Sequence, residues 1–219
     1  MDNLNLVSIN GEQVPTLEIL LMLTILMLLP SILIMVTSFT RIIIILSFTR
    51  NAIGVQQTPP NMVLVGIALF LTLFIMSPVL NRINTEAYVP YKEGQIAETE
   101  VFDRVQVPLK EFMLKETEES ALNLFINISD TEVVENPMEY SMLVIIPAFI
   151  TSELKKGFLT GLLLYIPFLL IDIVVSSTLM SMGMIMLPPA TIAMPFKLLL
   201  FVTVDGWQRL FEAIVAGFL

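Results

Sequence analysis

Few residue types in this chain could carry out chemistry. The 219 residues include no cysteine and no histidine, which excludes thiol nucleophiles, disulfides, Cys/His zinc sites and a histidine general base. Asp172 and Asp205 would be the candidates for an intramembrane aspartyl protease, in which two carboxylates share a proton. Nothing in their spacing requires them to meet, and the glycine-rich context of such a site is missing. We therefore predict no catalytic, cofactor-binding or metal-binding residues, and no enzymatic activity.

Single ionisable residues inside apolar stretches are the next candidates. Asp172 lies in Leu-Ile-Asp-Ile-Val, where a carboxylate is expected to face the bundle interior and to have a partner. That partner is Lys197, Arg41 or a residue of another subunit, and the alternative is a proton relay. Glu153, in Thr-Ser-Glu-Leu-Lys-Lys, could cap a helix, contact a neighbouring subunit or lie in a solvated turn. We interpret Arg41, Glu153, Asp172 and Lys197 as structural residues or subunit contacts.

A methionine-rich stretch is the most unusual feature of the chain, which has 14 methionines. Methionine recurs at every second position of the stretch, at 180, 182, 184 and 186. On a helix such residues lie about 200° apart, so the four would cover two faces, and Pro188-Pro189 is expected to stop the helix. The stretch is either ordinary core filling or a flexible apolar collar that could seal a pore.

The elements that position these residues are predicted to be apolar helices. The chain is 56% hydrophobic and 14% charged, with a mean hydropathy of +0.85, whereas soluble domains carry about 25% charge. Charge-free runs cover 19–40, 51–81, 140–152, 157–171 and 173–196. A membrane-spanning helix needs about 20 residues, so 140–152 is too short and is predicted to form a helical hairpin with the next apolar run. The predicted fold class is all-α, built from helical hairpins with kinked helices.

Proline occurs in nearly every apolar segment. It kinks a helix and leaves a backbone carbonyl without its hydrogen-bond donor. Because a freed carbonyl cannot face lipid, these helices are expected to pack on other protein. The prolines are at 30, 78, 147, 167, 188, 189 and 195.

An acidic insert divides the chain. Residues 86–139 hold 13 acidic and 4 basic residues, while the remainder is neutral. We predict three regions: an N-terminal hairpin of two apolar helices (1–81), a partly helical extracytoplasmic insert (82–139) with a helix at 107–125, and C-terminal apolar helices with a methionine-rich gate loop (140–219). No basic patch is present, so a nucleic-acid partner is not expected.

The distribution of Lys and Arg predicts sidedness, because cytoplasmic loops collect them. By this rule the N-terminus and 82–139 lie outside, and the links 41–60 and 153–157 lie inside. The first apolar run lacks a basic n-region and a cleavage site, so it is expected to be a retained helix.

Three blocks of sequence resemble the FliP (FliP/SctR) family of bacterial type III protein-export gates. The first block is TSFTRIIIILSFTRNAIGVQQTPPN at 37–61, continued by GIALFLTLFIMSP at 66–78. The second is IPAFITSELK at 146–155 with PFLLID at 167–172. The third is MSMGMIMLPP at 180–189, PFKLLLFV at 195–202 and DGW at 205–207. Their order and spacing match the family over most of the chain outside the insert.

The resemblance implies a pore-forming subunit of the flagellar export gate in the bacterial inner membrane, multi-pass and part of the flagellar basal body. Five copies would join FliQ and FliR, work with FlhA and FlhB, and pass unfolded substrates outward. The injectisome export gate is the alternative, followed by an ion or proton transporter with Asp172 as relay. The family's methionine gasket maps onto Met184, Ile185 and Met186, where Ile185 departs from the usual methionine and Met182 could compensate. Glu153 matches a family position implicated in subunit contacts.

Overall fold

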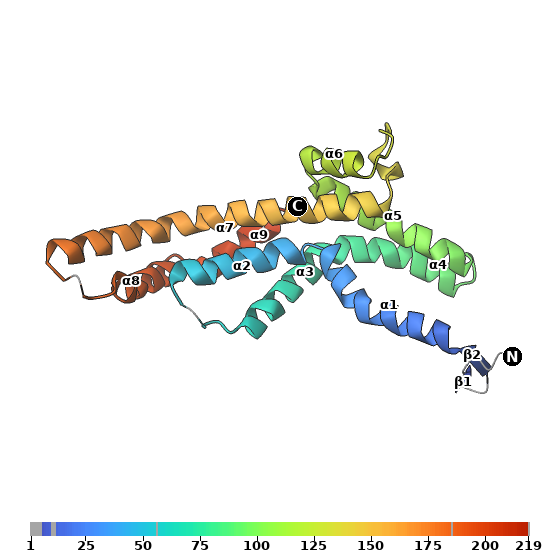
Figure 1. Ribbon diagram of the computed structural model, residues 1–219, viewed down its shortest axis with the longest axis horizontal. Coiled ribbons are helices and arrows are strands. Elements are labelled where there is room, and N and C mark those ends of the chain that lie inside the picture. The colour runs from blue at the N-terminus through green and yellow to red at the C-terminus, as the bar shows by residue number, and fades with distance from the viewer. Residues whose placement is uncertain (1–5, 10–11, 56, 185, 219) are drawn as a thin grey trace.

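A computed structural model describes residues 6–9, 12–55, 57–184 and 186–218. Figure 1 shows an elongated bundle in which one long helix, α7, runs along most of the molecule. The prediction of a helical fold is confirmed, with one small antiparallel hairpin of two strands added near the N-terminus. The elements are β1 (Leu6–Ile9), β2 (Glu12–Pro15), α1 (Thr16–Met35), α2 (Phe39–Ile53), α3 (Asn61–Ile83), η1 (Asn84–Tyr88), α4 (Val89–Lys92), α5 (Glu98–Glu116), α6 (Glu119–Ile128), η2 (Pro137–Glu139), α7 (Met142–Ser181), α8 (Pro189–Thr203) and α9 (Gly206–Ala216).

The helix α7 is one continuous element of 40 residues, about 60 Å long. The Ser141 side chain caps its start by accepting the Leu143 N–H at 3.3 Å. The predicted hairpin with a link at 153–157 is therefore wrong. Lys155 and Lys156 made that segment resemble a loop, but they lie on the side of the helix and bind carboxylates of the insert. Pro147 and Pro167 are accommodated inside the helix.

The helix α2 runs parallel to α7 and packs closely against it. The contacts advance in the same direction along both helices: Arg41 contacts Glu153, and about two turns further on Phe48 contacts Gly161. A Cβ added to Gly161 would lie 2.5 Å from Phe48 Cγ, so only glycine permits this approach. The segment 41–60, predicted to be an inside link, thus consists mainly of a packed helix.

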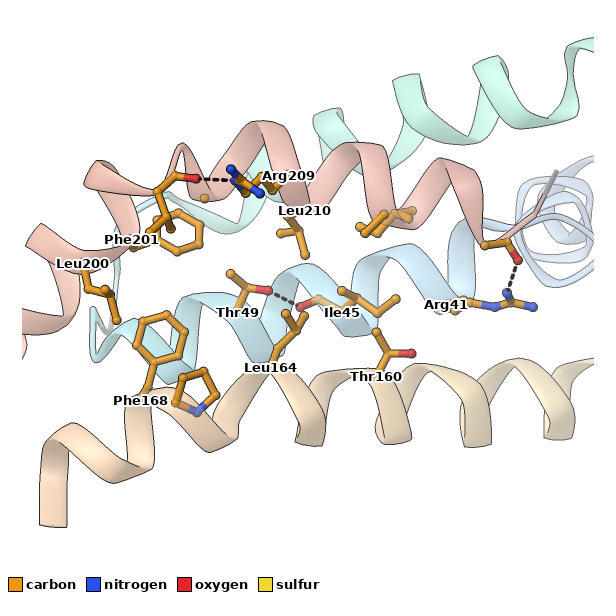
Figure 2. A pocket seen from close by; sticks show the side chains of 16 residues that line it. Arg41, Ile45, Thr49, Thr160, Leu164, Phe168, Leu200, Phe201, Arg209 and Leu210 are labelled. Carbon is orange, nitrogen blue, oxygen red and sulfur yellow. Dashed lines mark hydrogen bonds between the residues drawn. The ribbon is translucent and has the colours of Figure 1, made fainter.

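The C-terminal half does contain a helical hairpin, but its turn lies between α7 and α8, at the end of the molecule opposite the N-terminus (Figure 1). Beyond it, α8 and α9 form a pair bent by 64°, and α9 returns to pack on α2 and α3. The shared core there contains Phe39, Ile42, Ile45, Leu46, Leu64, Ala68, Ile75, Leu210, Ile214 and Phe218. A cavity of about 480 Å³ remains between α2, α7, α8 and α9 (Figure 2).

The acidic insert folds onto the first half of α7. Instead of one helix at 107–125, it forms α5 and α6, because Thr117 and Glu118 adopt extended backbone angles between them. Their apolar faces meet α7 in a second core of Val36, Met113, Ile126, Tyr140, Val144, Ile145 and Phe149.

Within the described parts of the chain, two continuous helical segments are long and apolar enough to cross a membrane, Asn61–Lys92 and Met142–Ser181. Two bent pairs, α1 with α2 at 66° and α8 with α9, would qualify if each acted as one span. The predicted separation of these links from the insert by a membrane is wrong, however. Segments assigned to opposite sides touch directly, since Arg41, Lys155 and Lys156 all bind carboxylates of the insert.

Candidate functional site

The methionine-rich stretch forms the tip of the α7–α8 hairpin. The helix α7 ends at Ser181, and two residues later Gly183 adopts a left-handed φ of +73°. The N–H of Gly183 donates to Met180 O and that of Met184 donates to Leu179 O, both at 3.0 Å. This double hydrogen bond is a Schellman cap, which glycine favours. The helix therefore stops before the prolines, and Pro188 and Pro189 begin α8 rather than end α7.

The methionines of this tip face outward. Met182 is 68% exposed, Met184 40% and Met186 99%, while Ile185 lies outside the described residues. Large apolar side chains that are exposed together mark a surface that contacts another molecule or lipid. The thioether chains are flexible and have little demand for hydrogen bonds, so they can adapt to a changing partner.

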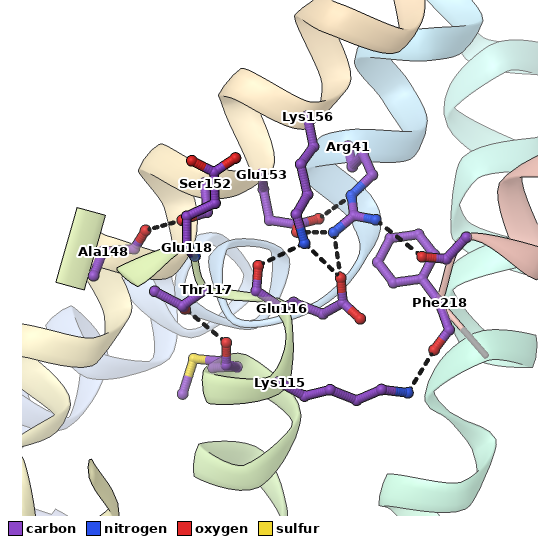
Figure 3. Close-up of polar contacts among 12 residues, drawn as sticks. Arg41, Lys115, Glu116, Thr117, Glu118, Ala148, Ser152, Glu153, Lys156 and Phe218 are labelled. Carbon is purple, nitrogen blue, oxygen red and sulfur yellow. Dashed lines mark hydrogen bonds and ion pairs between the residues drawn. The ribbon is translucent and has the colours of Figure 1, made fainter. Parts of the chain in front are cut away.

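A cluster of four charged residues, three of them buried, lies where α2, α5 and α7 meet (Figure 3). Arg41 Nε donates to Glu153 Oε2 at 2.9 Å, and its Nη2 binds both Glu153 Oε1 and Glu116 Oε2, the latter at 2.6 Å. Lys156 Nζ donates to the Glu116 backbone O at 2.8 Å and to its Oε2 at 3.0 Å. Two cations thus balance two carboxylates.

The C-terminal end of the described chain joins the same cluster. Arg41 Nη1 donates to Gly217 O at 3.3 Å, and Arg41 Cζ lies 3.9 Å from the centre of the Phe218 ring. Lys115 Nζ donates to Phe218 O at 3.0 Å. The cluster therefore ties α2, the insert, α7 and the end of α9 together.

Sequence reasoning named Arg41 and Glu153 but missed Glu116 and Lys156. A signal for Glu116 existed, because it continues the helical spacing of Leu109, Phe112 and Met113 and so lies on the apolar face of α5. Lys156 carried no signal that separated it from Lys155, which lies on the exposed side and pairs with Glu118 at 2.6 Å.

Asp172 finds its partner within the same chain. Lys197 Nζ, on α8, donates to Asp172 Oδ2 at 2.7 Å, and the Lys197 side chain is buried. Of the alternatives left open by the sequence, Lys197 is the residue found there, while Arg41 belongs to the other cluster. Asp172 Oδ1 is buried and has no hydrogen-bond partner among the described residues.

These features define a class: a helical protein of the membrane type, held by buried ion pairs, with an exposed apolar tip. The profile of the FliP family matches residues 22–214. The chain is 51% identical to flagellar biosynthetic protein FliP of Pectobacterium carotovorum subsp. carotovorum, over 95% of the chain and 82% of that protein. The FliP proteins of Aquifex aeolicus and Bacillus subtilis are 48% and 47% identical, over 95% and 93% of the chain and 88% and 92% of their own lengths.

The chain belongs to the FliP family, which confirms the resemblance found in its sequence.

Proposed function

We propose that this chain is a pore-forming, non-enzymatic subunit of the flagellar protein-export gate in the bacterial inner membrane. Its relatives are named flagellar biosynthetic proteins. The observation that carries the pore role is the methionine tip, a set of flexible apolar side chains exposed at the end of a long helical hairpin. The flagellar relatives also favour a flagellar over an injectisome gate.

Several copies, five by the family resemblance, surround a central path together with FliQ and FliR, next to FlhA and FlhB. This assembly passes unfolded flagellar proteins across the membrane. Support comes from the exposed apolar side chains along α1, α3, α7 and α8, because such large apolar surfaces require lipid or other subunits as their environment.

In this assembly the tips of the copies converge on the path. When no substrate is present, Met182, Met184 and Met186 with Ile185 close it by excluding water, as apolar constrictions do in channels. A passing segment displaces the thioether chains, which change rotamer readily because they are unbranched.

The test is a leak measurement in cells that produce only the variant protein. Met184→Ala together with Met186→Ala is expected to raise permeability to ions and small solutes, because smaller side chains leave the path open. Met27→Ala, at a methionine on α1 that is also exposed, is the control and is expected to leave permeability unchanged. Unchanged permeability in the double variant, at normal protein levels, would rule out the seal.

We do not propose a proton relay at Asp172, because Lys197 neutralises it within the chain. Asp172→Asn is expected to weaken assembly more than it changes proton conductance. A variant complex with full stoichiometry but no proton uptake would favour the transporter instead.

A further inference from the structure

The cavity between α2, α7, α8 and α9 has a predominantly apolar wall. Its volume is about 480 Å³, within the range of small-molecule sites. Side chains from all four helices line it, among them Ile45, Leu164, Phe168, Leu200, Leu210 and Ile214. Figure 2 shows the labelled ones, such as Ile45, Leu164 and Leu210, in the space between the helices.

The cavity extends along α2 (Figure 2). Phe168 and Phe201, whose ring centroids lie 6.3 Å apart, line one end, and Arg41 with Gly217 lines the other. Between Arg41 and Thr49 the wall follows eight residues of α2, about 12 Å. The Thr49 hydroxyl donates to Ile45 O at 2.9 Å, so it offers the cavity no free donor.

Arg209 is an exposed cation at the edge of this apolar space. Its Nε donates to Val204 O at 2.9 Å (Figure 2). A guanidinium has five N–H donors, and among the described residues no carboxylate lies within ion-pair distance of Arg209. Arg41, at one end of the cavity, is instead paired with two glutamates.

We propose that the cavity holds one acyl chain of a membrane phospholipid, with the lipid phosphate on Arg209. An apolar space with one uncompensated cation at its edge complements an amphipathic anion. A phospholipid carries the acyl chain and the anion in one molecule, whereas a second copy would have to place an apolar side chain in the cavity and a carboxylate at Arg209. The inference rests on the membrane location proposed above, but not on export or on the methionine seal.

The single tryptophan of the chain provides a direct probe. Trp207 packs on Phe201, a residue of the cavity wall, with ring centroids 5.1 Å apart. Brominated acyl chains quench indole fluorescence on close approach. We therefore expect phosphatidylglycerol with brominated chains, titrated into the full-length protein in detergent, to quench Trp207 saturably at about one lipid per chain.

Two alanines of α9 give a matched pair of variants. Ala213 lines the cavity, whereas Ala216 is exposed but does not line it. Ala213→Phe is expected to abolish the saturable quenching by filling the space, and Ala216→Phe to retain it.

Arg209→Gln tests the phosphate contact without filling the cavity. It is expected to raise the lipid concentration at half-saturation about tenfold, since a hydrogen bond to a charged group contributes roughly this much. Quenching by a brominated fatty alcohol, which has no phosphate, should be the same in both proteins.

The proposal is overturned if quenching rises linearly with lipid and is equal in both alanine variants, because lipid then only surrounds the protein. It is also overturned if quenching is saturable in monomers but lost in oligomers, which would assign the cavity to a second copy. Either result would leave the seal test unaffected, so the two proposals can fail separately.

Discussion

Two regions of the same α7–α8 hairpin differ in which kind of side chain they bury and which they expose. In the ion-pair cluster, Glu153 is completely buried in the first third of α7 and is held by Arg41. At the tip that follows α7, Met186 is 99% exposed. In these two regions a charged group is inside and an apolar group outside, the reverse of the usual arrangement in a soluble domain.

The difference separates residues that make their contacts within this chain from residues whose contacts require another molecule. Apolar helices surrounded by lipid gain little from apolar contact alone, so polar pairs and close packing at small residues must define how they meet. The cluster supplies such pairs within one chain, whereas Met182 and Met186 at the tip are left mostly uncovered by the described residues. We therefore expect substitutions in the cluster to affect folding, and substitutions at the tip to leave folding intact.

The largest effect is expected from Arg41→Met. This change leaves Glu153 buried without its cation, while Glu116 keeps Lys156. Breaking a buried pair on one side costs about 3–5 kcal/mol. Denaturant unfolding of the purified protein in detergent measures the loss, and Arg104→Met, at an exposed arginine of the insert, serves as the control.

A double variant separates charge burial from lost packing. Replacing Arg41 and Glu153 together by methionine removes both charges, which is often neutral or stabilising relative to the ion pair. We expect it to recover most of the stability lost in the single variant. A double variant as unstable as Arg41→Met would show that the charge of Glu153 is not the cause.

The second effect tests the close packing of α2 on α7. Gly161→Ala places a Cβ 2.5 Å from Phe48 Cγ, and such overpacking costs about 1–3 kcal/mol. Gly157→Ala should cost less, because its nearest contact, Ile44 Cγ2, lies at 3.2 Å. Gly66→Ala is the control, since nothing lies within 4 Å of its added Cβ and alanine favours a helix. Equal unfolding midpoints for the Gly161 and Gly66 variants would contradict the packing.

The helices and the family could be predicted from the sequence, but the ion-pair partners of the charged residues could not. Apolar composition and run length predicted helices, and the order of motifs predicted the family. The error at 153–157 arose because Lys155 and Lys156 fit the rule for a cytoplasmic loop. Their carboxylate partners, Glu118 and Glu116, lie nearly 40 residues earlier in sequence, a separation that periodicity cannot bridge.

The end of α7 at the methionine tip was also not predictable from the sequence. The spacing of the methionines and Pro188-Pro189 suggested a helix that continues up to the prolines. Gly183 ended it earlier, because a left-handed residue allowed the last carbonyls of α7 to be capped. Glycine in an apolar helix signals either close packing, as at Gly161, or termination, as at Gly183, and sequence alone does not separate the two.

A smaller effect is expected at the solvent-exposed edge of the cluster. A hydrogen bond from Lys155 lowers the pKa of the Glu118 carboxyl below its ordinary value of 4.5. Because this pKa is lower in the folded chain, the pair stabilises the fold above about pH 4.5 and loses its effect as pH falls through the lowered pKa.

Unfolding midpoints of the unchanged protein and of Glu118→Gln, measured across pH, isolate this contribution. The difference should be present at pH 7, be smaller than that of Gly161→Ala, and vanish in acid. A difference that persists unchanged at pH 3 would assign it to something other than the carboxylate.

The smallest effect on folding is expected from Met186→Ala, and it is the sharpest test of the contrast. The side chain has almost no contact with its own chain, so its loss should change the free energy of unfolding by less than about 0.5 kcal/mol. Met113→Ala, at a methionine of α5 that is completely buried in the core shared with α7, should cost about 2–5 kcal/mol. The same substitution thus separates a methionine that holds the fold from one left free for another molecule. If Met186→Ala destabilised the isolated chain as much as Met113→Ala, the tip would belong to the fold, and its exposure could no longer support a seal formed between subunits.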